Sequence, residues 1–234
     1  MRRLLGRTAS PTASSPAPDV PGEDPAGLQL AGSARDLAVF AERAARHDPA
    51  TPVRVQASGL VLAAYVTTPF ECLGLRVTRL ARDASIDAVV EAVGLAARAR
   101  GASDGVLALP PRLPDITWMA PLPPRTGWSE VDRRPCRDVR ALVAAGTDEF
   151  RRRAGQVQAG PGTSAALEAI AEDVWSHALV SDVPARLAHA ADYLGFLSDD
   201  GEAVVRSLGP WRRLDTPLGV VVARVSDRLG LFVS

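Results

Sequence analysis

The sequence contains no lysine: all 27 of its basic residues are arginine, and 27 acidic residues balance them. The formal net charge is therefore zero, so the chain has no overall field that would draw it to nucleic acid or to an anionic membrane surface. A charged partner would have to be recognised through a local patch. The sequence also lacks any run of about 18 apolar residues, the length that a membrane-spanning helix requires.

Cysteine is scarce as well. Cys72 and Cys136 are the only two, 64 positions apart, and neither belongs to a CxxC or Cys/His motif. This spacing indicates neither a disulfide framework nor a zinc site, so we expect two buried or half-buried thiols in a reducing cytoplasm. The first ten residues have the basic opening of a signal peptide, but only Leu4 and Leu5 follow before polar residues. We therefore predict a cytoplasmic location.

Histidine, a frequent residue in acid–base catalysis and metal binding, occurs three times. His177 and His189 fall on successive predicted helices, and a carboxylate such as Asp173 or Asp182 could join them around a metal ion. A closed site needs a fourth ligand, which the sequence does not offer, so two surface histidines are the favoured interpretation. No nucleophile–base pair has meaningful spacing, and the glycines match no phosphate-binding motif. We expect no catalytic, cofactor-binding or metal-binding residues, which favours a protein that is not an enzyme.

The chain has 234 residues, 47% hydrophobic and 23% charged, which suits folded domains with real cores. Residues 1–32 are rich in proline, serine, alanine and glycine and predict a disordered tail. Residues 33–109 predict a small α+β domain. Its predicted elements are a helix from Ser33 to about His47, an antiparallel meander of three strands between residues 52 and 82, a helix from Asp83 or Ser85 to Gly101, and a short strand at 105–109.

Residues 110–128 contain six prolines, which excludes a regular helix or a central strand. We interpret this segment as an extended strap between two domains, with its tryptophans packed on its neighbours. A second interpretation makes residues 121–125, Pro-Leu-Pro-Pro-Arg, a ligand for the kind of aromatic-lined groove that binds PxxP segments. A proline-rich connection flanked by tryptophans is more often structural, so we favour the strap.

Residues 129–234 predict a second domain, made of helices followed by a β-hairpin. Its most regular helical pattern begins at Thr163 or Ser164 and continues to Leu179, and another helix ends at Gly195. Shorter helices are predicted at 137–145 and 147–153, strands at 202–207, 211–214 and 219–225, and an edge strand at 231–233. The whole chain is therefore predicted to be α+β, with a helix–antiparallel sheet–helix unit, a strap, and a C-terminal half that is winged-helix-like.

In a winged helix that binds DNA, the third helix enters the major groove and the hairpin touches the phosphate backbone. Arg186 and His189 are accordingly our candidates for base contacts. Charge argues against this function, because residues 129–234 carry 13 arginines and 15 acidic residues, a net charge of −2, whereas residues 33–128 carry 11 and 9, a net charge of +2. The candidates for phosphate contacts are Arg206, Arg212, Arg213 and Arg224.

Large apolar residues outside the predicted cores favour protein association instead. Trp118, Met119, Trp128 and Trp211 lie in the strap and the hairpin, where a monomer has no need of them. Our main hypothesis is therefore a non-enzymatic cytoplasmic protein that associates with itself or with a partner protein. Nucleic-acid binding is the alternative, and a small-ligand or enzymatic site at the domain junction near the strap is the third hypothesis.

Two segments carry a resemblance to known proteins. Residues 121–128, PLPPRTGW, and residues 211–224, WRRLDTPLGVVVAR, resemble segments of conserved proteins of high-GC Gram-positive, actinobacterial type that have no assigned activity. The resemblance implies a lineage and a cytoplasmic setting, and it carries over no catalytic residue.

Overall fold

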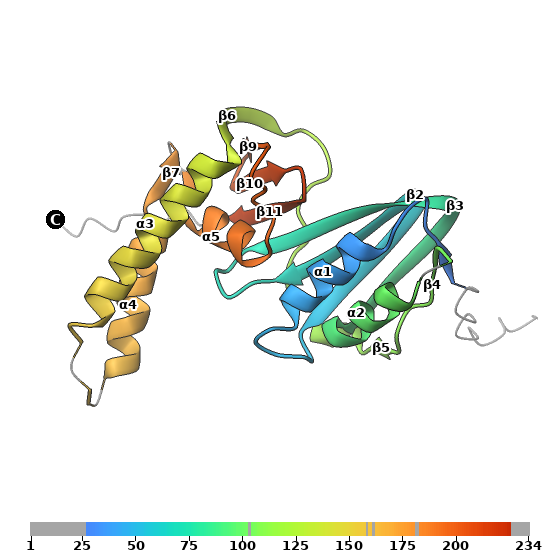
Figure 1. Cartoon of the computed structure of the whole chain (residues 1–234), viewed down its shortest axis with the longest axis horizontal. Helices are drawn as coiled ribbons and strands as arrows, with labels where there is room; N and C mark the ends of the chain where they lie inside the picture. The colour runs from blue at the N-terminus through green and yellow to red at the C-terminus, as the bar shows by residue number, and fades with distance from the viewer. Residues whose placement is uncertain (1–26, 103, 158, 161, 181–182, 226–234) are drawn as a thin grey trace, which may run out of the picture.

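A computed structural model describes residues 27–225 except 103, 158, 161 and 181–182 (Figure 1). The predicted α+β class is confirmed, because helices and antiparallel strands are mixed along the described chain. In chain order the elements are β1 Leu28–Gln29, α1 Arg35–Ala44, β2 Pro52–Thr67, β3 Leu73–Glu91, α2 Ala92–Gly101, β4 Val106–Leu107, β5 Arg112–Leu113, the 3-10 helix η1 Asp115–Thr117, β6 Ser129–Pro135, α3 Cys136–Ala154, α4 Thr163–Ser176, β7 Ala178–Val180, β8 Val183–Pro184, α5 Arg186–Tyr193, β9 Glu202–Leu208, β10 Trp211–Thr216 and β11 Gly219–Arg224.

The fold begins earlier than the sequence predicts. β1 pairs with β4 in a two-stranded sheet, and Leu28 and Leu30 are buried in the main core. Residues 27–32 therefore belong to the folded part of the chain instead of to a disordered tail. The rest of the predicted tail lies outside the described residues. α1 follows as predicted, with its apolar face in the main core.

β2 and β3 form one long antiparallel hairpin instead of the predicted three-stranded meander. The pair Ser58–Gly59, which separates two of the predicted strands, lies inside β2, where the register with β3 shifts between Gly59 and Val61. Gly59 has a φ of 59°, a left-handed backbone that suits glycine and accommodates a bulge. The hairpin bends at this bulge, so its two arms continue in different directions (Figure 1).

The helix predicted to begin at Asp83 or Ser85 begins only at Ala92, because its first part is the end of β3. Ile86 and Val90 point into the main core and pair with residues of β2. The apolar run fits both a helical stripe and a buried strand, and local periodicity does not separate the two. Pairing along the whole length of β2 decides for the strand.

The helices of the second half differ from the prediction in their limits. α3 is a single helix of 19 residues that includes Gly146, where the sequence predicts two shorter helices. α4 ends at Ser176, and residues 178–180 form β7, which pairs with β8. Val174 of α4 is buried, but most of its apolar stripe is only half-buried, because α3 and α4 project together from the body (Figure 1). None of the described helices is long and apolar enough to cross a membrane.

One seven-stranded antiparallel sheet joins the two halves of the chain. Its order is β2-β3-β11-β10-β9-β6, and β5 pairs with the C-terminal end of β3. The halves meet where β11 pairs with β3, with Val220 opposite Leu75 and Val222 opposite Leu73. The winged-helix-like interpretation is not confirmed, because the strands that follow α5 lie inside this larger sheet. The edge strand predicted at 231–233 lies outside the described residues.

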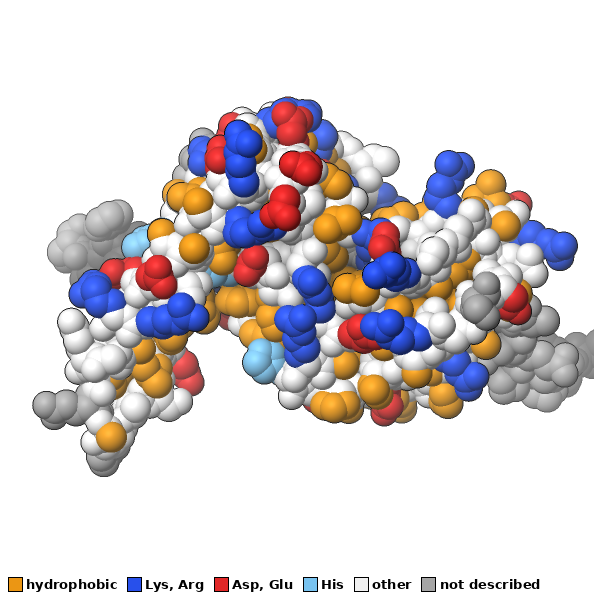
Figure 2. Space-filling view, in the orientation of Figure 1, with side chains coloured by type: hydrophobic (Ala, Val, Ile, Leu, Met, Phe, Trp, Pro, Cys, Tyr) orange, Lys and Arg blue, Asp and Glu red, His pale blue; other side chains and the backbone are white. Residues whose placement is uncertain are grey.

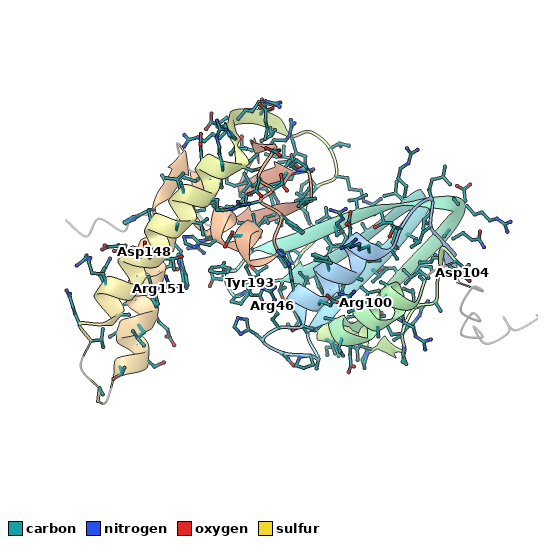
Figure 3. The ribbon with its side chains drawn as sticks, in the orientation of Figure 1. Arg46, Arg100, Asp104, Asp148, Arg151 and Tyr193 are labelled. Atoms are coloured by element: carbon teal, nitrogen blue, oxygen red, sulfur yellow. The ribbon has the colours of Figure 1, made fainter. Side chains whose placement is uncertain are left out.

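In the described part of the chain, the α-helices that pack on the sheet cover one of its faces. α1 and α2 pack side by side over the β2–β3 hairpin, and α5 packs on β10 and β11 (Figure 1). The main core lies between these helices and the sheet and takes residues from both 33–109 and 129–234. Tyr193 of α5 lies near Arg46, which follows α1 (Figure 3). Its ring stacks on that of His47, with ring centroids 5.6 Å apart. The two predicted domains therefore share one core, and whether each folds alone stays a prediction.

Candidate functional site

The face of the sheet that the helices leave uncovered changes character from one edge to the other. One cross-strand row begins with Leu73 on β3 and Val222 on β11 and continues with Arg213 on β10, Arg206 on β9 and Glu130 on β6. Side chains in one such row point to the same face, which we call the free face. In this row the free face is therefore apolar over β3 and β11 and charged over β10, β9 and β6. Farther along β2 and β3, the free face also carries the ion pair of Arg54 with Asp87.

The strap crosses the apolar part of the free face. Trp118 anchors it, because the ring is buried against Tyr65, Leu73 and Val89. The indole Nε1 donates a hydrogen bond to the carbonyl oxygen of Ala120 at 2.8 Å, so the polar atom of the ring is satisfied. These contacts form a second core, separate from the main core on the helix side. The strap is thus held to the sheet through one of its tryptophans.

A groove remains open between the end of the strap and the β2–β3 hairpin. Its volume is about 380 Å³, and Val61 and Val77 on its floor are each 46% exposed. Both valines lie on strands whose other face is packed under helices, so water reaches one side of the sheet here. The groove is lined by Gln56, Ser58, Val61, Ala63, Tyr65, Leu75, Val77, Pro123, Pro124, Arg125, Arg213 and Val222.

Two arginines lie at the rim of the groove. Arg125 and Arg213 are among the described residues that line it, and none of those residues is acidic. Arg125 Nη2 donates to Gln56 Oε1 at 3.3 Å, and the Arg213 guanidinium lies 5.4 Å from the ring centre of Trp128. Burial raises the pKa of Tyr65 despite both arginines, so its hydroxyl stays neutral at physiological pH. The groove therefore suits an apolar segment with an acidic group at the rim.

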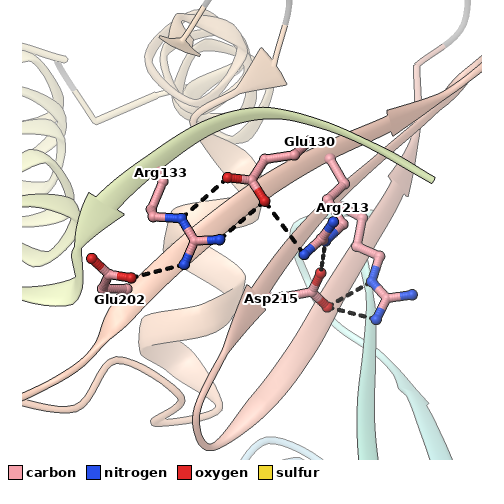
Figure 4. Close-up of polar contacts among 6 residues, drawn as sticks. Glu130, Arg133, Glu202, Arg213 and Asp215 are labelled. Carbon is pink, nitrogen blue, oxygen red and sulfur yellow. Dashed lines mark hydrogen bonds and ion pairs between the residues drawn. The ribbon is translucent and has the colours of Figure 1, made fainter.

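The charged part of the free face is a chain of six alternating acids and bases (Figure 4). Arg133 bridges Glu202 at 2.8 Å and Glu130 at 3.0 Å. At the other end, Asp215 accepts from one arginine on each side, at 2.8 and 2.6 Å. Because each charge faces one of opposite sign, the chain presents no single sign to a partner. We call it the ionic ladder, whose members in order are Glu202, Arg133, Glu130, Arg206, Asp215 and Arg213.

The four residues predicted to form an interaction surface lie in different environments. Trp118 is buried beneath the strap, so it holds the fold instead of meeting a partner. Trp128 is half-buried, and its Nε1 donates to the carbonyl oxygen of Pro124 at 2.9 Å. Met119 is 87% exposed, and Trp211 is half-buried in the wall of a smaller pocket. Met119 is thus the residue that a partner could reach most directly.

The two residues predicted to face DNA bases have other contacts. His189 is only 6% exposed and packs on the rings of Phe70 and Trp175. Arg186 lies between Glu71 at 2.7 Å and Glu172 at 2.9 Å. A buried imidazole and a guanidinium held by two carboxylates could read base edges only after these contacts were broken. α5 therefore does not present them as a recognition surface.

The four arginines predicted to touch phosphates are not gathered into one patch. Arg206 and Arg213 belong to the ionic ladder on the free face. Arg212, next to Arg213 in an extended strand, points to the other side of β10 and donates to the carbonyl oxygen of Gly209 at 2.7 Å. Arg224 is exposed at the end of β11. On the face shown in Figure 2, acidic and basic side chains are likewise interspersed.

The histidine pair considered for a metal site is not brought together with its carboxylates. His177 is exposed beyond α4, whereas His189 is buried in α5. Asp173 forms an ion pair with Arg153, and Asp182 lies outside the described residues. Within the described part of the chain, no group of three or more histidine, cysteine or acidic residues is placed to hold a metal ion.

Both cysteines are buried, as the sequence predicts. Cys72 lies at the turn between β2 and β3, and burial raises the pKa of its thiol to about 12. A thiol with so high a pKa is neutral at physiological pH and therefore a poor nucleophile. Cys72 serves as a small apolar side chain at the start of β3.

The groove was not predicted from the sequence, although the strands that form its floor show a recognisable apolar pattern. Val61, Ala63 and Tyr65 alternate along β2, and Leu75 and Val77 alternate along β3. The two-residue period identifies one side of each strand as apolar. The intervening residues of β2 are apolar too, so the sequence does not say which face the helices cover.

Two family models match the chain, one to each half. Residues 24–120 match a domain of unknown function, DUF8010, and residues 123–228 match a second one, DUF8185. The boundary between the two matches falls inside the strap. No curated protein matches the sequence significantly. These matches do not test the expected actinobacterial lineage, which stays a prediction.

Among solved structures, the chain is similar to DNA polymerase III beta subunits. A structure from Eubacterium rectale, provisionally assigned as such a subunit, is 9% identical with a TM-score of 0.50, and the match covers 86% of this chain and 65% of that one. A sliding clamp from Bartonella birtlesii bound to griselimycin is 11% identical with a TM-score of 0.49 and the same coverage. A sliding clamp from Pseudomonas aeruginosa is 12% identical with a TM-score of 0.48, covering 84% of this chain and 64% of that one.

This chain therefore spans less than two thirds of the length of the structures it matches. At such low identity the likeness concerns the fold alone. Models of two domains of unknown function thus match successive parts of the chain, and its fold is similar to that of a DNA polymerase III beta subunit.

Proposed function

We propose that the protein acts by protein association and that the groove on the free face binds an extended, apolar, acidic segment of a partner protein. The observation that carries this proposal is the groove itself. It leaves Val61 and Val77 open to water at 46% exposure on strands that are otherwise packed. Exposed apolar surface with a polar rim is a common feature of binding sites for other proteins.

The chemistry of the groove supports an extended peptide as the occupant. Its floor offers a row of apolar side chains from two neighbouring strands, and Pro123 and Pro124 form a wall without backbone donors. A peptide carboxylate would meet Arg125 at the rim, whereas the neighbouring Arg213 is already paired with Asp215. Guanidinium groups suit this contact because they bind carboxylates with two parallel hydrogen bonds.

The fold likeness is consistent with association. The Eubacterium rectale structure is described as a subunit, that is, as one part of an assembly. DNA binding by this chain gains no specific support, since most of the predicted contact residues are occupied by ion pairs or buried. A small-ligand site near the strap would use the same groove, and it is a distinct outcome of the test.

A peptide-display selection against the full chain tests the proposal. We expect enrichment of apolar sequences that contain aspartate or glutamate, and direct binding of synthetic versions measured by fluorescence anisotropy. Val77→Glu should weaken this binding at least tenfold, because it places a like charge and a polar group on the groove floor.

Val93→Glu is the matched control. Val93 is also 46% exposed but lies on α2, away from the free face, so its substitution should leave peptide binding unchanged. Enrichment of no common sequence, or equal loss of binding in both variants, would contradict the proposal. Salt-sensitive binding of a labelled DNA duplex in place of peptide would favour the nucleic-acid alternative.

A further inference from the structure

A second pocket lies on the free face where the described chain ends. Its volume is about 210 Å³, and most of its lining is apolar. It lies between the strap, the turn that joins β2 to β3, and the paired strands β10 and β11. Its lining residues are Thr67, Glu71, Cys72, Leu73, Ala120, Pro121, Trp211, Val222 and Arg224.

The last described residues lie at this pocket. Arg224, the last residue of β11, lines it, and the amide of Val225 donates to the carbonyl oxygen of Pro210 at 2.8 Å. These contacts fix the starting point of the residues that follow. Nine more residues, 226–234, complete the sequence, and an extended segment of this length spans up to roughly 30 Å. The pocket is therefore well within their reach.

The sequence of residues 226–234 is Ser-Asp-Arg-Leu-Gly-Leu-Phe-Val-Ser. Four of these nine side chains are large and apolar, and they are concentrated at Leu229 and 231–233. The one acid of the segment, Asp227, and its one base, Arg228, precede these apolar residues. The pocket also has one base and one acid among its lining residues, Arg224 and Glu71. An apolar segment that emerges beside an apolar pocket loses least conformational entropy by binding there, because its end is already held in place.

We propose that residues 226–234 bind in this pocket of their own chain, with Leu231 and Phe232 against Trp211, Pro121 and Leu73. The segment then covers the half-buried indole of Trp211, one of the residues that the sequence marks as an interaction site. This inference goes beyond the proposed function, since it concerns a different pocket that shares only Val222 with the groove.

The test compares the full wild-type chain with the full chain carrying Leu231→Asp and Phe232→Asp. The probe is a fluorescein-labelled peptide of residues 226–234, followed by anisotropy. The doubly substituted chain should bind the peptide, because its own segment no longer fills the pocket. The wild-type chain should bind it at least tenfold more weakly, since a segment on a short tether competes at a millimolar effective concentration.

Two controls define the site. A peptide with the same two aspartates should not bind, and Ala120→Arg in the doubly substituted chain should abolish binding of the normal peptide, because Ala120 is half-buried in the pocket wall. Val77→Glu should leave this binding intact. The result therefore distinguishes failure of this inference from failure of the proposed groove.

Three outcomes would overturn the inference. The first is the absence of peptide binding by the doubly substituted chain. The second is equal affinity of the two chains for the peptide. The third is a wild-type dimer, detected by light scattering, that the double substitution dissociates, because the segment would then bind a second copy.

Discussion

The apolar and the charged parts of the free face belong to the same sheet, but they differ in whether their side chains have partners. On β10, β9 and β6 every member of the ionic ladder faces a partner of opposite charge (Figure 4). On β2 and β3, by contrast, Val61 and Val77 have no such cover. The strap shields part of this apolar half through Trp118 and leaves the rest as the groove.

The comparison indicates which part of the free face would gain more free energy by contacting a partner. A paired charge gains little from a new partner, because an existing contact must be broken first. An exposed apolar side chain gains the full transfer free energy when a partner covers it, about 25 cal/mol per Å². The apolar half is therefore the half that can bind, although the charged half is the more conspicuous in the sequence.

The largest effect should come from removing the anchor of the strap. Trp118→Ala should lower the free energy of unfolding by about 3–5 kcal/mol, because it empties the centre of the second core. Urea denaturation followed by circular dichroism measures this change. Met119→Ala, one residue away but 87% exposed, should change stability by less than about 0.5 kcal/mol. Equal effects of the two substitutions would mean that the strap does not pack on the sheet.

A smaller effect is expected in the ionic ladder. Asp215→Asn removes the charge that Arg206 and Arg213 share, and all three side chains are substantially shielded from water. We expect a loss of about 1–3 kcal/mol in the free energy of unfolding. Glu202→Gln, at the exposed end of the ladder, should cost at most about 1 kcal/mol. A loss at Glu202 as large as that at Asp215 would contradict the idea that shielding sets the strength of the ladder.

The covered face and the free face should differ in how their ionisable groups make stability depend on pH. Burial lowers the pKa of His189 on the covered face, so below about pH 6.5 the unfolded chain binds a proton that the folded chain does not. Stability should therefore fall as the pH drops from about 6.5, by up to about 1.4 kcal/mol per pH unit. Glu130 on the free face does not contribute in this window, because Arg133 lowers the pKa of its carboxyl group further below its usual range.

Urea denaturation at pH 7.5, 6.5 and 5.5 measures this dependence. His189→Gln should flatten the slope, and His177→Gln, at an exposed position, should leave it as in the wild type. A slope that survives the substitution of His189 would assign the effect to other groups.

Features fixed by short-range chemistry were predictable. α1 follows from its helical spacing of apolar residues, and six prolines predict the strap at 110–128. Proline excludes helix and central strand wherever it occurs, whatever the rest of the fold does. The α+β class follows in the same way from the alternation of helical and strand periods along the chain.

Features that depend on distant partners were not predictable. The apolar run at 86–90 fits a helix or a strand, and its pairing with residues of β2 that lie 29 to 37 positions earlier selects the strand. Arg186 and His189 were the candidates for base contacts, but α5 turns His189 into the core and sets Arg186 between two carboxylates. Trp118 and Met119 are neighbours in sequence, and only packing decides that one is buried and the other exposed.

The sequence by itself determined the α+β class, the helix α1 and the proline-rich strap, and it indicated an absence of recognisable catalytic motifs. The tertiary structure decided which face of the sheet the helices cover, and therefore where the groove, the smaller pocket and the ionic ladder lie. The physical reason is that local propensity acts over a few residues, whereas a binding surface arises from what remains uncovered after strands such as β3 and β11, far apart in the chain, have paired.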